Sequence, residues 1–314
     1  MKKALLLIAA ILLIAVICIY FFIPSNIEIA DVAAAKTTKD GAYRMIASKT
    51  AWKKWWNYNT STKNTANNDT IFPKGVYIFN LTGHDFNGAL VSIQHKNKTI
   101  SSKISLLQLP MDSVGIMWQC SLQTSANPVE KIKQYFEAVS IKKNMKDALN
   151  CFKAFVEKDE NIYGMKILES SIKDSFLISE KREFAQQPTM NEVYTLINDL
   201  KQYAAQNNCM QTNPPMLNIL TDSDKYRVMV ALPVNKPILT KPPVSLIKMV
   251  KGNFMIAQVH GGLRSVQNAL QQMQLYFSDY NKTSMAIPFQ YLVTDRLKEA
   301  DTTKWITEIY APVL

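Results

Sequence analysis

The sequence predicts a mixed α+β protein, with one apolar N-terminal helix followed by two globular domains. Three observations predict it: an apolar run at residues 4–23, short β-patterned segments followed by a long amphipathic stretch, and a strand–helix–strand–strand pattern that occurs twice near the C-terminus. About 290 residues remain after the apolar run, and one domain usually takes about 100–200 residues, which favours two domains. We place the segments at residues 1–26, 27–170 and 174–314.

The apolar run is long enough to cross a membrane. A helix needs about 20 apolar residues to span the hydrocarbon core, whereas a cleaved signal peptide has about 7–15 apolar residues and then small ones. Here residues 20–23 are bulky, and Ile17 stands where a small residue would precede a lipid-modified Cys18. We therefore expect an uncleaved anchor, with the membrane as a partner.

The flanking charges predict the orientation of this anchor. Lys2 and Lys3 precede the run, whereas Glu28 and Asp31 come before the next lysine, Lys36. Positive residues stay on the cytoplasmic side. We expect a single-pass protein of the cell membrane with most of the chain outside the cytoplasm.

Charge and cysteine content exclude some classes of protein. The net charge of +11 comes from lysines scattered among acidic residues, and no nucleic-acid footprint is expected because such a footprint would cluster its charge. Attraction to anionic lipid headgroups stays open. Outside the anchor lie Cys120, Cys151 and Cys209, an odd number, so at most one disulfide could form and free thiols are preferred.

For the first domain, 27–170, the sequence predicts an antiparallel sheet around one long helix. A strand at 27–34 and a helical stretch at 39–56 are followed by four strands, at 76–80, 89–93, 99–108 and 115–123. Asn127-Pro128 then opens the long helix, because Asn caps helices and Pro tolerates the first position. We expect its buried face to carry Val129, Ile132, Tyr135, Phe136, Val139, Met145, Leu149, Phe152 and Phe155.

The second domain, 174–314, contains an internal repeat. Residues 175–179 recur at 253–257, residues 215–222 at 288–295, and residues 231–234 at 310–313. Thr189 and Glu192 have the spacing of a capping box at the start of the first repeat's helix. Apolar stripes follow in both helices: Val193, Ile197, Leu200 and Ala204, then Val266, Ala269, Leu270, Met273, Tyr276 and Phe277. Two such halves would pair about a pseudo-twofold axis, and the groove between them is the natural place for a ligand.

These residues resemble two known families. The second domain resembles the GyrI-like effector-binding domains through Gly252-Asn253-Phe254, His260-Gly261-Gly262 and the terminal strand 305–313. The first domain resembles the SRPBCC (START-like, helix-grip) superfamily in the order of its elements, in Trp52 and Trp55-Trp56, and in Asn127-Pro128. The combination of an anchor with both domains is similar to bacterial membrane proteins.

The resemblance implies a pocket for a small hydrophobic or amphipathic molecule, often a cation, with an acidic residue at its floor. This chain departs from the family at Gln290, where a glutamate is usual, because an amide cannot neutralise a buried cation. Glu308 could supply the charge instead: it shares a strand face with Ile306 and Tyr310, although it could equally lie on the surface of an edge strand.

Other residues of the second domain are candidates for the same ligand site. Tyr226, Tyr291, Trp305 and Tyr310 could present ring faces to a ligand, or belong to the core. His260 could be a donor at the pocket rim or a turn residue.

Signatures of catalysis and cofactor binding are largely missing from the sequence. Nine glycines form no Walker loop, no G-x-G-x-x-G fingerprint and no G-x-S-x-G elbow, and His84, His95 and His260 have no partners at metal-ligand spacing. We therefore expect no cofactor and no metal, and a membrane-anchored, non-enzymatic binding protein.

Two alternatives remain. One is a weak hydrolase that uses Glu308 with Tyr291 or Tyr310, because some GyrI-like proteins are hydrolases. The other is a scaffold whose pockets are closed by side chains. No DNA-binding helix pair precedes the effector-like domain, which disfavours a transcription regulator. The ligand, the protein partners and the oligomeric state are not predicted.

Overall fold

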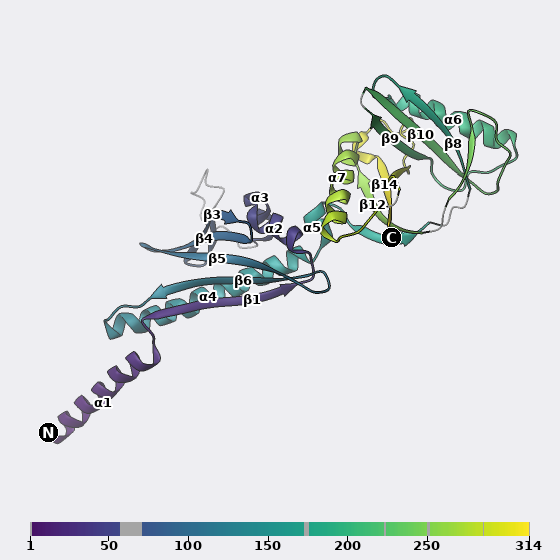
Figure 1. Cartoon of the computed structure of the whole chain (residues 1–314). Coiled ribbons are helices and arrows are strands. Elements are labelled where there is room, and N and C mark those ends of the chain that lie inside the picture. The colour runs from purple at the N-terminus through teal and green to yellow at the C-terminus, as the bar shows by residue number, and fades with distance from the viewer. Residues whose placement is uncertain are drawn as a thin grey trace. The chain divides into compact units, whose positions relative to one another are not determined.

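The computed structural model describes residues 2–56, 71–172, 176–222, 224–249, 252–284 and 286–313. It is a mixed α+β structure with two antiparallel sheets, in two compact units, Met1–Lys158 and Asp159–Leu314 (Figure 1). The division falls earlier than the boundary we placed at 170. Helix α5 (Asp159–Tyr163) and strand β7 (Ile167–Ser171) belong to the second unit, because β7 pairs with a strand of the second sheet.

The first unit begins with the apolar helix α1 (Lys2–Phe22). Its segment Leu5–Phe22 is long and apolar enough to cross a membrane by length and composition, and none of it is buried in the protein. Near its end, the hydroxyl of Tyr20 donates to the carbonyl of Ala126, and the amine of Lys131 lies 5.2 Å from the centre of the Tyr20 ring.

The sheet of the first unit is a six-stranded antiparallel layer in the order β1-β6-β5-β4-β3-β2. Its strands are β1 (Asn26–Ala35), β2 (Ile71–Lys74), β3 (Tyr77–Asp85), β4 (Gly88–His95), β5 (Lys98–Leu109) and β6 (Ser113–Gln123). All except β2 were predicted, with ends that differ by a few residues. The helical stretch expected at 39–56 is two helices, α2 (Lys39–Ala47) and α3 (Lys49–Trp55), because Ser48 is extended and its hydroxyl accepts from the Ala51 amide to cap the second helix.

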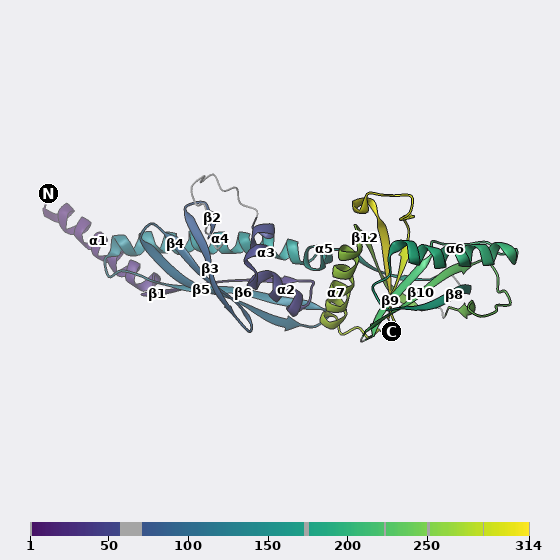
Figure 2. The same ribbon diagram turned by 90° about the horizontal axis from the view of Figure 1, so that it is seen from above.

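The long helix α4 (Pro128–Val156) runs along this sheet beside β1 (Figures 1 and 2). Asn127 caps it as predicted, but the expected apolar face is wrong in the first half. The side chains exposed there are Val129, Tyr135, Phe136 and Val139, whereas the buried ones are Lys131, Ala138, Ile141, Met145, Ala148, Leu149, Phe152 and Val156. Six positions separate Val139 from Met145, which is about 240° around the helix at 3.6 residues per turn, so one face cannot carry both.

Aromatic side chains fill the space between this sheet and α4. Trp52, Trp55 and Trp56 are buried. The Trp52 and Trp55 rings lie 4.6 Å apart between centroids, and Trp55 meets Phe152 of α4 at 5.0 Å. The indole N–H of Trp52 donates to the Ile46 carbonyl at 2.6 Å. These rings pack against one another and against α4 in the core of the first unit.

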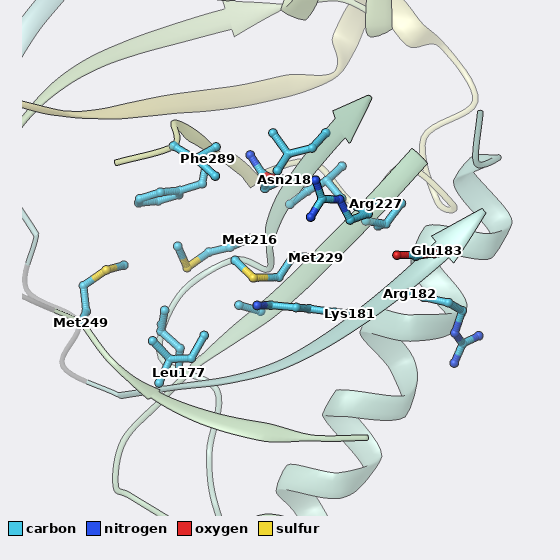
Figure 3. A pocket seen from close by; sticks show the side chains of 16 residues that line it. Leu177, Lys181, Arg182, Glu183, Met216, Asn218, Arg227, Met229, Met249 and Phe289 are labelled. Atoms are coloured by element: carbon cyan, nitrogen blue, oxygen red, sulfur yellow. The ribbon is translucent and has the colours of Figure 1, made fainter. Parts of the chain in front are cut away.

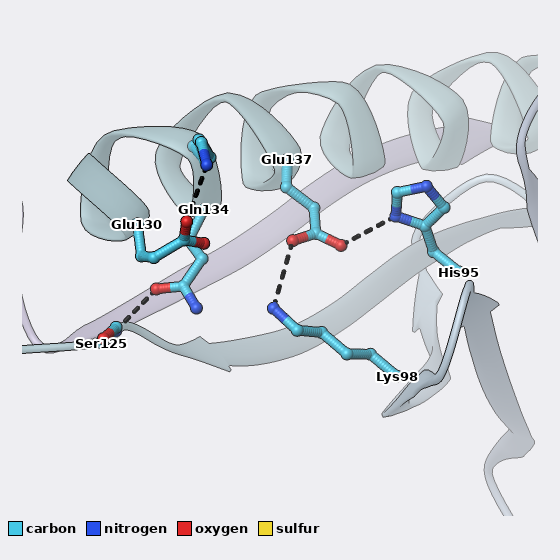
Figure 4. A network of polar contacts seen from close by, with 7 residues as sticks. His95, Lys98, Ser125, Glu130, Gln134 and Glu137 are labelled. Atoms are coloured by element: carbon cyan, nitrogen blue, oxygen red, sulfur yellow. Dashed lines mark hydrogen bonds and ion pairs between the residues drawn. The ribbon is translucent and has the colours of Figure 1, made fainter. Parts of the chain in front are cut away.

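Two histidines of the first unit have structural partners. Glu137 of α4 lies 3.0 Å from His95 Nδ1 and 3.8 Å from Lys98 Nζ, which ties the β4–β5 hairpin to the helix (Figure 4). His84 Nδ1 lies 3.1 Å from the Tyr43 hydroxyl. All four cysteines are free thiols, and burial raises the pKa of Cys120 to about 11, so it is protonated at neutral pH.

The second unit is built on an eight-stranded antiparallel sheet in the order β11-β8-β10-β9-β13-β14-β12-β7. Its further strands are β8 (Phe176–Phe184), β9 (Met216–Asp222), β10 (Lys225–Val234), β11 (Ser245–Lys248), β12 (Asn253–His260), β13 (Phe289–Leu292) and β14 (Ile306–Val313). This strand order is symmetric about its centre. Strands β8, β10 and β9 on one side correspond to β12, β14 and β13 on the other. The two sequence repeats therefore meet at the β9–β13 pair.

Helices α6 (Met190–Gln206) and α7 (Leu263–Asp279) bury the apolar stripes that the sequence predicted, apart from a half-buried Leu270. Thr189 and Glu192 form the predicted capping box. The stripe of α6 packs on one face of the sheet, against Ile178, Leu217, Val228, Val230 and Leu232. We call this the α6 face. A second apolar cluster, on the opposite face, contains Leu177, Met216, Ala231, Phe254, Phe289 and Tyr291.

The strand register corrects one part of the repeat. The sequence matched Phe176 with Phe254, but Leu177 pairs with Pro233 while Phe254 pairs with Pro312. Because the two prolines are equivalent in the repeat, Leu177 is the counterpart of Phe254. A shift of one residue in a strand moves a side chain to the other face, and Leu177 and Phe254 do lie in the same apolar cluster on one face of the sheet.

We expect Gly88→Ala to destabilise the first unit. A methyl group on Gly88 would lie 1.8 Å from the carbonyl oxygen of Ile104 in the neighbouring strand, whereas one on Gly115 would find its nearest neighbour at an ordinary 3.6 Å. Gly88→Ala should cost about 3 kcal/mol or more of unfolding free energy, in the range of disrupted backbone packing.

Tryptophan fluorescence during denaturation of the full chain in detergent measures this effect, because four of the five tryptophans lie in the first unit. Gly115→Ala is the control. Equal unfolding midpoints for the two variants would show that the β4–β5 contact is looser than described.

Candidate functional site

A large pocket opens on the sheet face opposite α6, within the first repeat (Figure 3). Its volume is about 570 Å³, and strands β8, β9, β10, β11 and β13 contribute its walls. The apolar lining consists of the buried Leu177, Met216, Ala231 and Phe289, with Met229, Ile247, Met249 and Ile287 around them. We call this the large pocket.

A few polar groups enter the large pocket. Asn218 is half-buried, and its side-chain amide donates to the Pro288 carbonyl at 2.8 Å. Lys181 of β8 and Arg227 of β10 are exposed at the rim, and Figure 3 shows both side chains directed into the pocket. Glu183 lies on the same strand face as Lys181 and forms an ion pair with Lys225 at 3.3 Å.

A small pocket of about 220 Å³ lies beside the strands of the second repeat. Its lining includes Tyr291, Glu308 and Tyr310, together with Ser170, Ser171, Ile172, Asn213, Pro214 and Ile256. The Tyr310 hydroxyl donates to the Glu308 carboxylate at 3.1 Å, and the Tyr310 ring meets the Tyr291 ring edge-on at 4.9 Å. Aromatic rings therefore occupy most of the space on this side.

The two pockets occupy equivalent places in the repeat. The register of β9 with β10 matches that of β13 with β14. The corresponding positions are therefore Tyr291 and Asn218, Glu308 and Met229, and Tyr310 and Ala231. The first repeat thus has an asparagine and an alanine where the second has two tyrosines, and these side chains are smaller. This difference explains why the pocket of the first repeat is the larger one.

Of the residues that the sequence singled out, Glu308, Tyr291 and Tyr310 come together, all in the small pocket. Gln290 does not join them. It pairs with Leu217 of β9, whose side chain is on the α6 face, and strand alternation turns it away from Tyr291. Tyr226 also lies on the α6 face, two residues before Val228 of the α6 cluster.

Trp305 and His260 line neither the large pocket nor the small pocket. Trp305 lies over the guanidinium of the buried Arg296, with 4.9 Å between the guanidinium carbon and the ring centre, and its indole N–H donates to the Glu299 carbonyl at 2.8 Å. Arg296 also donates to the Thr307 hydroxyl at 2.7 Å, and desolvation lowers its pKa from the usual value. His260 is exposed at the end of β12, opposite Ile306, and lines neither pocket.

The large pocket contains none of the residues predicted from the sequence. Its methionines and its two cations were missed because nothing in a strand pattern says which of two apolar faces stays open. Alternation placed Leu177 and Lys181 on one face of β8, but only the packing of α6 on the other face shows that theirs is the free one. Among the described residues, no group of three or more His, Cys, Asp or Glu side chains could hold a metal ion.

No protein-family model and no curated protein matches this chain. Solved structures do match. The EcmrR C-terminal domain is 15% identical with a TM-score of 0.42, and covers 48% of this chain and 98% of its own. SAV2435 bound to tetraphenylphosphonium is 14% identical with a TM-score of 0.33, and covers 48% and 94%. A hydrolase from Listeria innocua is 12% identical with a TM-score of 0.36, and covers 46% and 91%. At these identities and scores, the similarities say nothing of a ligand or an activity in this chain.

We expect Trp305→Leu to destabilise the second unit, because the indole covers a buried cation. The loss should be about 2 kcal/mol, the size of a desolvated cation–π contact, with a smaller loss for the control Trp305→Phe. Hydrogen exchange of the β14 amides in the full chain measures it. Unchanged exchange in Trp305→Leu would contradict a structural role and return Trp305 to the ligand candidates.

Proposed function

We propose that this chain is a membrane-anchored binding protein whose second unit holds a small apolar or amphipathic molecule in the large pocket. One observation carries the proposal: a pocket of about 570 Å³ with an apolar floor lies where the second repeat has tyrosines. Small-molecule sites usually have about 300–1,000 Å³, a mostly apolar lining and a few polar groups that fix orientation.

The lining of the large pocket suits a flexible guest. Met216 of β9, Met229 of β10 and Met249, just after β11, line it (Figure 3). Methionine side chains are unbranched and polarisable, and adapt to irregular partners. The pocket therefore recognises an apolar body by contact area, and the polar groups at its rim set the direction in which the guest lies.

The anchor is part of the proposal. Two features support it: the exposed apolar surface of α1, and the exposed stripe of Val129, Tyr135, Phe136 and Val139 on α4. The start of α4 is tied to α1 through Tyr20, Ala126 and Lys131. Apolar and aromatic side chains next to a spanning helix would lie in the headgroup region, which favours such rings. The proposed topology is single-pass with the N-terminus in the cytoplasm.

The family assignments belong to the same proposal. A six-stranded antiparallel sheet with one long helix supports a helix-grip first unit, and the strand order that is symmetric about β9–β13 supports a duplicated GyrI-like second unit. In the first unit the buried tryptophans fill the interior, so we assign it a role in spacing or partner contact. The scaffold alternative requires closed pockets in the second unit as well, which the open large pocket argues against.

We expect Ala231→Tyr to block the large pocket, because it places there the side chain that its counterpart Tyr310 has. Full-length protein in lipid nanodiscs is exposed to a photoreactive neutral alkanol that carries a diazirine, and labelled peptides are read by mass spectrometry. Labelling of the strands around Met229 and Met249 should fall about tenfold, an affinity loss near 1.4 kcal/mol.

Leu246→Tyr is the matched control, because Leu246 pairs with Ile178 on the α6 face and its side chain cannot enter the pocket. Equal labelling of Ala231→Tyr and Leu246→Tyr, or no labelling of these strands in the unaltered protein, would refute ligand binding at this site.

A second candidate function is hydrolysis at the small pocket, favoured by the contact between Tyr310 and Glu308. We expect it to be absent, since the small pocket leaves about 220 Å³ beside its rings. Hydrolysis of a panel of activated esters and amides should proceed at the buffer rate with the unaltered protein and with Glu308→Gln alike. Turnover that Glu308→Gln abolishes, while labelling of the large pocket is kept, would establish the hydrolase.

A further inference from the structure

The rim of the large pocket is cationic on the side of β8 and β10. Lys181 faces Met229 across the two strands, and Arg227 faces Glu183. Figure 3 shows the Lys181 amine and the Arg227 guanidinium both directed over the methionines of the pocket. No carboxylate in the described part of the chain forms an ion pair with Lys181.

The acidic group of this pocket does not pair with Lys181. Glu183 is the carboxylate in the lining, and it forms an ion pair with Lys225 at 3.3 Å. Arg182, also near the pocket, points away in Figure 3 and forms an ion pair with Glu180 at 2.6 Å. Lys181 therefore presents a positive charge to the interior of the pocket.

The second repeat shows that the fold does not require these cations. In the corrected register, Lys181 corresponds to Gln258 and Arg227 corresponds to Ile306. Gln258 and Ile306 are both neutral. One acidic residue of the second repeat, Glu308, lines the small pocket. The large pocket thus has two cations at its rim, beside the ion-paired Glu183, at positions that are neutral in the second repeat.

We propose that the large pocket selects an anionic single-chain amphiphile, with a carboxylate between Lys181 and Arg227 and an apolar tail along Met216, Met229 and Met249. The proposal rests on the proposed binding function and narrows it. Arginine offers a planar fork of donors that matches a carboxylate, and lysine adds a second charged donor. The Asn218 amide lies beside the head position, and the tail lies on the apolar floor formed by Phe289 and Leu177. This charge is opposite to that of the cationic guest which the sequence resemblance implies.

Three competitors with the same eight-carbon tail test the charge preference. Full-length protein in phosphatidylcholine nanodiscs is labelled with the neutral diazirine alkanol, and octanoate, octan-1-ol or octyltrimethylammonium is added at pH 7.5, where the carboxylate is ionised. Empty nanodiscs correct for uptake of each competitor by the bilayer. The readout is the concentration that halves labelling of the pocket strands.

We expect octanoate to halve the labelling at a concentration about fivefold or more below that of octyltrimethylammonium, as one charge-assisted contact at a partly exposed site gives. Lys181→Gln should raise the octanoate value about fivefold and leave the octanol value unchanged. Arg227→Gln should act in the same direction. Arg182→Gln is the matched control, because it removes the same charge from the adjacent residue, whose side chain points away from the pocket.

The outcomes separate the two proposals. If the three competitors act alike, if the cation is preferred, or if Lys181→Gln behaves like Arg182→Gln, the anion preference is refuted while ligand binding stands. If the pocket strands are not labelled at all, the binding function itself is refuted.

Discussion

The pairing of β9 with β13 is the contact on which the second unit depends. The described register joins Leu217 to Gln290 and Met216 to Tyr291, and two further hydrogen bonds extend it. The Asn218 amide donates to the Pro288 carbonyl at 2.8 Å, and the Leu292 amide donates to the Pro215 carbonyl at 2.9 Å. This short seam joins two half-sheets into one layer.

Strands with matching registers on the two sides of this seam enclose two different interiors. On one side Asn218 and Ala231 leave a cavity, and on the other Tyr291 and Tyr310 fill most of the equivalent space. Protein interiors are close-packed, so a change in side-chain volume at a fixed backbone appears directly as cavity volume. The charges follow the same division, since Lys181 lies at the rim of the large pocket and Glu308 lines the small one.

In the first unit, aromatic residues fill the interior. Its tryptophans pack against one another and against α4, which gives a filled interior with large buried area per residue. What this unit leaves open is an outer surface, the stripe of Val129, Tyr135, Phe136 and Val139. The unit is therefore suited to contact with a surface, of a membrane or of a partner, and the second unit to enclosing a small molecule.

The sequence alone determined the elements: the apolar helix, the strands of the first sheet except β2, the caps at Asn127 and Thr189, and the apolar stripes of α6 and α7. Each of these depends on local chemistry, on capping geometry or on periodicity within one segment. The domain boundary was placed too late, because β7 carries no sign of the distant strand β12 with which it pairs.

The site was decided by the tertiary structure. Alternation in one strand places Glu308 and Tyr310 on the same face, and the sheet adds Tyr291 to them at a small pocket, whereas Gln290 faces the other side of the sheet. Lys181 and Met229 were not predicted as pocket residues, because an alternating strand has two faces and its sequence does not say which one a helix covers. Helix α6 packs on one face, so the pocket lies on the other. Residues far apart in the chain then met on the other face, where side-chain volume left room for a guest.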